Sequence, residues 1–207
     1  MSTDANTVKE TPSVTLACGI DFGTSEIAVA VSSADAPFSA QLVRNYMSNE
    51  TTPGVVKIYE NSRSYGEEAA ATVTSCPQNV YSHFPLILAN INKVNELKER
   101  YPDLCFSVRE GENNSLVMDV TNDADVKEVS LTHMISMLFH YIYRFVSEQY
   151  PKHVENTVIA VPNEIPQESV RAVLDAAELA GFKNVRVVPT NAAQAYKYSL
   201  CLTTHYS

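Results

Sequence analysis

The stretch that most constrains the fold is Leu16–Ser25, LACGIDFGTS, an apolar strand that ends in a Gly-Thr-Ser turn and is followed by a second apolar strand at Glu26–Val31. Side chains alternate along a strand, so Ala17, Gly19 and Asp21 share one face, where small residues leave room for a ligand. A carboxylate in such a strand indicates a task or a partner. The turn's N–H groups can bind an anion, and Asp21 could hold a divalent cation, directly or through water. Read alone, the pattern is typical of a phosphate-binding hairpin or of an ordinary hairpin whose Asp caps the turn.

The composition indicates a globular protein. The 207 residues are 45% hydrophobic and 19% charged, which suits one large domain or two small subdomains. A net charge of −9 argues against nucleic acid or an anionic membrane as the main partner. Cys18, Cys76, Cys105 and Cys201 are scattered, without a CxxC pair, and no apolar signal or membrane-length run is present. We therefore expect a cytoplasmic protein with reduced thiols and no direct contact with nucleic acid or membrane.

The order of predicted elements is an antiparallel meander, a weaker middle segment, and a strand–helix–strand–helix run, which predicts an α/β layer architecture. Strands are predicted at 14–22, 26–32, 39–44, 54–60, 64–65, 105–110, 115–121, 128–130, 157–161 and 185–188. The strands at 157–161 and 185–188 are apolar enough to be buried on both faces. The segment 46–53 is predicted to be a polar connection.

Helices are predicted at 66–73, at 79–90 with an interruption at Pro85, at 131–150, from Pro166 to Gly181, and at 191–200. The helix at 131–150 is the clearest, because its apolar residues form one stripe behind the N-cap residue Ser130. His133 and His140 lie away from that stripe and are expected at the surface, not in a metal site.

The weaker middle segment divides the chain. We predict a disordered tail at 1–13, one subdomain formed by 14–53 together with 128–207, and an inserted subdomain at 54–127.

Several blocks follow one another in a characteristic order: GIDFGTS at 19–25, TVIAVP at 157–162, AELAGF at 177–182 and VRVVPTNAAQAY at 185–196. In order and spacing they resemble the first half of the actin-like nucleotide-binding domain of the seventy-kilodalton heat-shock chaperone family. NETTP at 49–53 and YGEEAA at 65–70 resemble two further segments of that family. The resemblance implies an actin-like ATPase (ribonuclease H-like) lobe of α/β class, with a mixed five-stranded sheet, helices and a small α+β insert.

The resemblance also implies roles for individual residues. Asp21 would be the catalytic carboxylate and would hold the water shell of a nucleotide-bound Mg²⁺, while Gly23, Thr24 and Ser25 would bind ATP or ADP phosphates. Pro162 matches a proline that couples nucleotide state to substrate binding. The family's coupling arginine falls on Val170, so the adjacent Arg171 is the candidate for that role. ATP or ADP and Mg²⁺ are expected for the complete domain, with weak or absent binding by this half alone.

Three expected polar groups are missing. The family's catalytic lysine falls on Pro85, the following arginine on Leu86, and a glutamate on Val188. Glu26 replaces a tyrosine and brings a negative charge near the phosphates. Loss of one electrostatic stabiliser of phosphoryl transfer costs on the order of 10²-fold in rate. The pattern resembles the atypical ribosome-associated or one-hundred-and-ten-kilodalton branches, which bind nucleotide with little or no hydrolysis.

We therefore expect part of a longer, stress-related chaperone or co-chaperone that binds ATP and assists protein folding. Its expected partners are a J-domain co-chaperone or another chaperone, the ribosome, and unfolded polypeptide bound by a C-terminal domain outside this chain.

Three alternatives stay open. One is an active ATP-hydrolysing chaperone that uses substitute groups, for which Lys57, Lys93 and Lys98 are candidates that the spacing does not separate. Another is a different actin-like protein, such as a sugar kinase or a filament protein. The last is an α/β domain without a ligand.

Overall fold

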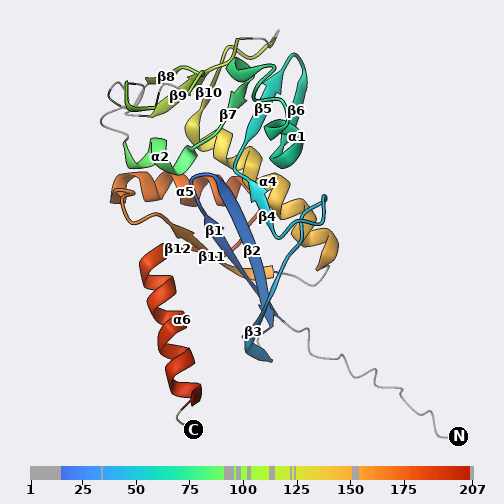
Figure 1. Cartoon of the computed structure of the whole chain (residues 1–207), viewed down its shortest axis with the longest axis vertical. Coiled ribbons are helices and arrows are strands. Elements are labelled where there is room, and N and C mark those ends of the chain that lie inside the picture. Colours follow the sequence, from blue (N-terminus) through green and yellow to red (C-terminus); the bar gives the residue numbers. More distant parts are fainter. Residues whose placement is uncertain are drawn as a thin grey trace, which may run out of the picture.

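One mixed sheet forms the base of the protein, and two small sheets lie beside it (Figure 1). The computed structural model describes residues 15–33, 35–90, 96, 99–101, 104–111, 115–121, 123, 125–150 and 154–205. The main sheet has the order β12-β11-β1-β2-β3, and β4 also pairs with β2. Its strands are β1 (Leu16–Phe22), β2 (Glu26–Ser33), β3 (Ala36–Leu42), β4 (Thr51–Pro53), β11 (Val154–Val161) and β12 (Val185–Pro189). The predicted α/β class with a mixed sheet is confirmed, because β1 pairs antiparallel with β2 but parallel with β11.

The short strand β4 is a sixth member of this sheet, where we had predicted only a polar connection. It pairs antiparallel with Glu26–Ala28 of β2, while β3 pairs with β2 farther along, at Ala30–Ser33. The β-branched Thr51 and Thr52 suit an extended backbone. The strand β4 pairs with the part of β2 that β3 leaves unpaired.

Two helices cover one face of the main sheet. These are α4 (Leu131–Gln149) and α5 (Gln167–Ala180), and their buried residues share one core with Cys18, Ile20 and Phe22 of β1. The predicted N-cap is confirmed, because the N–H of His133 donates to Ser130 Oγ at 3.2 Å. The helix α5 ends at Gly181, whose φ of 106° is the left-handed conformation that favours glycine at this position.

The predicted apolar stripe of α4 is confirmed. All of its members are buried, and they are Leu131, Met134, Ile135, Leu138, Ile142, Phe145 and Val146. His133 and His140 are exposed, as expected. Among the residues that the structure describes, no group of three His, Cys, Asp or Glu side chains could hold a metal ion. None of the helices in this part of the chain is long and apolar enough to cross a membrane.

The middle of the chain forms the two small sheets and their short helices, which lie together in the upper part of Figure 1. One sheet has the order β6-β5-β7 and the other β10-β9-β8. The elements are β5 (Val56–Tyr59), β6 (Ser62–Tyr65), α1 (Gly66–Ala70), the 3₁₀ turn Pro77–Asn79, β7 (Val80–Tyr81), α2 (Phe84–Ala89), β8 (Val108–Glu110), β9 (Leu116–Asp119) and β10 (Glu128–Ser130).

The predicted subdomain boundaries stay a prediction. One hydrophobic core runs from the small sheets into the main sheet, so packing alone does not separate 54–127 from the rest. The predicted tail at 1–13 lies outside the described residues, as do residues 91–95, 97 and 98 of the predicted insert.

Our prediction of one interrupted helix at 79–90 is wrong. This segment forms a 3₁₀ turn and the strand β7, and α2 begins only at Phe84. Pro85 does not interrupt α2 but lies in its first turn, where the missing N–H has no intrahelical partner to lose. Its side chain is buried.

The prediction that β11 and β12 are buried on both faces is also wrong. Val158 is 39% exposed, and every residue of β12 is partly or fully exposed. The reason is that α4 and α5 cover only one face of the sheet. The helix α6 (Thr190–His205), which starts directly after β12, runs away from the main body in Figure 1, and its residues 191–199 are exposed.

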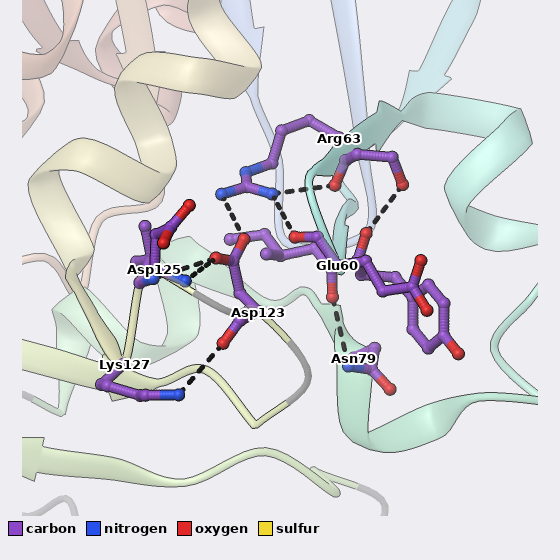
Figure 2. A network of polar contacts seen from close by, with 10 residues as sticks. Glu60, Arg63, Asn79, Asp123, Asp125 and Lys127 are labelled. Carbon is purple, nitrogen blue, oxygen red and sulfur yellow. Dashed lines mark hydrogen bonds and ion pairs between the residues drawn. The ribbon is translucent and has the colours of Figure 1, made fainter.

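A polar network joins the two small sheets (Figure 2). Arg63 of β6 places Nη2 2.8 Å from Asp123 Oδ2, and only 2% of the Asp123 side chain is exposed. The N–H groups of Val126 and Asp125 donate to Asp123 Oδ1 at 2.9 and 3.0 Å. These backbone hydrogen bonds, with a further contribution from Arg63, lower the pKa of Asp123 below its ordinary value.

Asp123→Asn should therefore destabilise the protein in a pH-dependent way. A lowered pKa means that folding favours the ionised carboxylate, so its stabilisation is present above the ordinary carboxyl pKa of about 4 and is lost as pH falls through the lowered value. Urea unfolding between about pH 3 and 7 should show a gap between the native protein and the variant that closes on acidification. The exposed Asp125→Asn is the matched control and should show no such gap.

Candidate phosphate-binding hairpin

Asp21 lies on the open face of the main sheet, as the alternation of side chains predicted. It is exposed, whereas its neighbours Ile20 and Phe22 are buried on the opposite face. Across the sheet it pairs with Ala28 of β2 and Ala160 of β11, and Ala160 pairs in turn with Val188 of β12. Asp21 is therefore the one carboxylate in a row of alkyl side chains.

A hollow of about 330 Å³ lies beside this row. Its wall includes Gly19, Asp21, Ala28, Ala160, Val188 and, from α6, Ala193. The small residues that leave space next to Asp21 therefore come from three strands. Val188, where the resemblance implies a glutamate, lies at the same surface.

The turn after β1 needs a glycine at residue 23. A Cβ at Gly23 would lie 2.6 Å from the carbonyl oxygen of Glu26, closer than such contacts are found. The N–H of Gly54 donates to the carbonyl oxygen of Ser25 at 2.8 Å, and this hydrogen bond holds the last residue of the turn. Thr24 is partly buried and Ser25 is exposed, so the hydroxyl groups border the same turn.

These residues fit the phosphate and Mg²⁺ groups that the resemblance implies. The tight turn leaves no room for a side chain at Gly23 and can direct backbone N–H groups at an anion. Mg²⁺ keeps several water ligands and binds through one or two carboxylates together with phosphates, so the single Asp21 suits a water-mediated contact. The individual roles of Asp21, Gly23, Thr24 and Ser25 stay a prediction.

The position where the resemblance implies a lysine holds no cation. Pro85 is buried, and Leu86 is partly buried. Two residues earlier, His83 has a left-handed backbone (φ 59°) at the N-cap of α2, and Ser82 Oγ lies 2.7 Å from its Nδ1. Sequence reasoning missed His83, because the prediction treats Pro85 as an interruption of a helix and not as the signal for a helix start that a proline in the first turn gives.

Of the three candidate substitute lysines, the described part of the chain includes Lys57. Lys57 lies on β5 with its Nζ 5.8 Å from the centre of the Tyr59 ring, in one of the small sheets. Lys93 and Lys98 lie outside the described residues.

Pro162 follows β11 directly, two residues beyond the partner of Asp21. The loop around it is fastened to the start of α6, because Thr190 Oγ1 donates to the carbonyl oxygen of Val161 at 3.0 Å and the N–H of Asn191 donates to Asn163 Oδ1 at 3.2 Å. Pro162 thus lies where the ends of β11 and β12 are connected, close to the predicted phosphate turn.

Arg171 does not lie on the same face of the sheet as Asp21. It is on α5, which covers the face of the sheet opposite to Asp21, and its side chain is 72% exposed. Its Nε lies 2.8 Å from Asp175 Oδ1, one helical turn away. The structure therefore does not bring Arg171 and Asp21 together, and the coupling role of Arg171 stays a prediction.

Comparison with known proteins agrees with this geometry. The family model described as Hsp70 protein matches residues 17–204. The chain belongs to the Hsp70 family. This is a family of nucleotide-binding ATPases, and the match covers every described strand of the main sheet except the first residue of β1.

Individual relatives are distant and longer. The chain is 25% identical to hypoxia up-regulated protein 1 of Xenopus laevis over 184 residues, which are 87% of this chain and 28% of the relative. It is 25% identical to heat shock protein 88 of Dictyostelium discoideum over 182 residues, 88% of this chain and 23% of the relative. Heat shock 70 kDa protein 15 of Arabidopsis thaliana is 25% identical over 185 residues, 89% of this chain and 22% of the relative. The chain thus spans about a quarter of the length of these relatives.

The close approach at Gly23 leads to a stability prediction. Gly23→Ala should cost about 1–3 kcal/mol in the free energy of unfolding, because the atom that blocks the new methyl group belongs to the backbone. Gly19→Ala is the matched control, since a Cβ there would lie 3.9 Å from the nearest atom, the carbonyl oxygen of Ala30. Urea unfolding of both variants checks the difference, and an equal loss would contradict the proposed crowding at the turn.

The burial of Pro85 leads to a second prediction. Pro85→Lys should lower the free energy of unfolding by about 2–4 kcal/mol without producing ATP hydrolysis, because the new ammonium group would be buried without a partner. Leu86→Lys is the control: the site is partly exposed, so the same charge should cost clearly less. Thermal unfolding together with a phosphate-release assay measures both effects.

Proposed function

We propose that this chain is the nucleotide-binding lobe of an atypical Hsp70-type chaperone or co-chaperone, which binds ATP with weak or absent hydrolysis and assists protein folding. The observation that carries the proposal is the combination of a tight, glycine-dependent turn with one exposed carboxylate in a row of alkyl side chains. The turn can bind an anion, whereas the surface around Asp21 has little with which to stabilise a transition state.

In this proposal the backbone N–H groups of the turn and the hydroxyl groups of Thr24 and Ser25 bind the phosphates, and Asp21 orients the waters of a bound Mg²⁺. Bound Mg²⁺ would neutralise charge on the phosphates. Glu26, exposed at the start of β2, adds negative charge beside the turn and weakens phosphate binding.

Two features support weak hydrolysis. Catalysis of phosphoryl transfer depends on positioned charges around the transferred group. The lysine position is the buried Pro85, and the glutamate position is Val188 in the alkyl row. Family membership favours this chaperone function over a sugar kinase or a filament protein.

The wider setting is part of the same proposal. The relatives' names refer to heat shock and to hypoxia, which supports a role in the stress response. We propose a J-domain co-chaperone or another chaperone, with the ribosome, as partners, and unfolded polypeptide as the client of a separate domain. The cytoplasmic location remains our proposal, supported by free cysteines at 18, 76 and 105.

Asp21→Asn should abolish the Mg²⁺-dependent part of ATP and ADP binding. Isothermal titration calorimetry with and without Mg²⁺ measures this, and we expect a weakening on the order of tenfold, because the variant loses the charge that attracts the hydrated cation. Asp35→Asn, in the exposed turn between β2 and β3, is the control and should bind as the native protein does.

Steady-state ATP turnover, measured in the longest natural protein that contains this sequence, tests the second half of the proposal. Turnover should be at least on the order of 10²-fold below that of an active family member. Rapid turnover that Asp21→Asn abolishes would support an active chaperone instead. Failure of the native chain and of that longer protein to bind nucleotide would overturn the proposal as a whole.

A further inference from the structure

Asn45 is a buried polar residue between β3 and β4 that the sequence analysis did not single out. Only 5% of it is exposed. Its Oδ1 accepts hydrogen bonds from the N–H groups of Met47 and Asn49, at 2.9 and 3.0 Å. This half of the amide organises its own loop, in which Ser48 has a left-handed backbone with φ 64°.

The other half of the amide reaches beyond the loop. Nδ2 donates to the carbonyl oxygen of Thr51 at 3.0 Å and to Thr52 Oγ1 at 3.1 Å, both on β4. It also donates to Glu67 Oε1 of α1 at 2.6 Å, a short bond to a charged acceptor. Asn45 therefore connects β4 to the first turn of α1.

The strand β4 in turn supports the predicted phosphate turn. It pairs with Glu26–Ala28, the residues that directly follow the turn, and the N–H of Gly54 just after β4 donates to the carbonyl oxygen of Ser25. Close packing also links β4 to α1, because a Cβ at Gly66 would lie 3.0 Å from Thr52 Cγ2. A displacement of β4 would move the backbone that shapes the turn.

We propose that Asn45 is a positioning residue for the phosphate-binding turn and that its bond to Glu67 connects the turn to α1. The expected effect on nucleotide affinity rests on the proposed nucleotide-binding function. The effect of Asn45 on the backbone of the turn can be tested without nucleotide. Asn45 acts through β4 and Gly54, and its own contacts are with the loop, β4 and α1.

Asn45→Asp tests the donor role of the amide separately from its acceptor role. The carboxylate keeps the acceptor for Met47 and Asn49 but replaces the donor with an oxygen that faces the acceptors on Thr51 and Glu67. Hydrogen exchange of the Gly54 amide, followed by NMR without nucleotide, should accelerate on the order of tenfold or more. The affinity for Mg²⁺-ATP should fall by about fivefold or more, because a displaced turn no longer matches the phosphates.

Asn49→Asp is the matched control. Asn49 Nδ2 also donates to Glu67 Oε1, at 2.8 Å, so the substitution makes the same charge change against the same carboxylate. Asn49 is exposed and forms no side-chain bond to β4 among the described contacts, so Gly54 exchange should stay within about twofold of the native rate.

Rescue separates positioning from simple loss of stability. Glu67→Gln alone should change little, because the glutamine oxygen still accepts from Asn45. In the double variant Asn45→Asp with Glu67→Gln, the new amide can donate to the new carboxylate. The increase in the logarithm of the Gly54 exchange rate should then be at most half of that in Asn45→Asp alone. If Asn45→Asp does not fold, Glu67→Ala, which removes only the α1 partner, should still accelerate Gly54 exchange.

The outcomes distinguish this inference from the proposed function. Unchanged Gly54 exchange in Asn45→Asp, an equal effect of Asn49→Asp, or the absence of any rescue would overturn the positioning role. If Gly54 exchange responds as expected but the native chain and the longest natural protein that contains it bind no nucleotide, the positioning role stands and the proposed function fails.

Discussion

The structure depends on the packing of β1 against α4 and α5 on one face of the main sheet. Phe22 of β1 meets Phe139 of α4 edge to face, with ring centroids 4.9 Å apart, and Ile20 is buried beside them. Because side chains alternate along a strand, this anchoring directs Asp21 to the opposite face. The core therefore determines where the carboxylate lies, and the parallel pairing with β11 brings Ala160 and Pro162 to the same end of the sheet.

The open face shows what kind of chemistry this arrangement allows. Its small residues leave space for a ligand, and the crowded Gly23 produces a tight turn that can bind an anion. The row around Asp21, however, supplies methyl and isopropyl groups from Ala28, Ala160 and Val188, and its one polar neighbour on β4 is the uncharged Thr51. Binding an anion requires a few well-placed donors, whereas accelerating phosphoryl transfer requires charges placed around the transferred group. The proposed function follows from this difference.

Sequence patterns were sufficient for elements whose packing is periodic. The apolar stripe of α4, its cap Ser130 and the face of Asp21 followed from spacing alone, because each depends on neighbours within a few residues. The strand β4 was missed, because its partner β2 is distant in the sequence. The start of α2 was missed although Pro85 in its first turn was a local signal for it. The exposure of β12 was also missed, since an apolar strand gives no sign of whether both faces are covered. Asn45 could not be singled out, because its partner Glu67 is 22 residues away and only the fold brings them together.

Residue 85, where the resemblance implies a lysine, also has a structural role. At this position the chain does not simply present a shorter side chain to the site, because Pro85 is buried in the first turn of α2 and Phe84 beside it is buried as well. The far end of α2 is fastened to α5, where the buried Ser169 Oγ donates to the carbonyl oxygen of Leu88 at 2.9 Å. Segment 84–88 therefore contributes to the core, and a lysine at residue 85 would remove part of that core. The apolar residues of this segment are thus part of the core, which is how the proposed loss of the lysine would be compatible with a stable lobe.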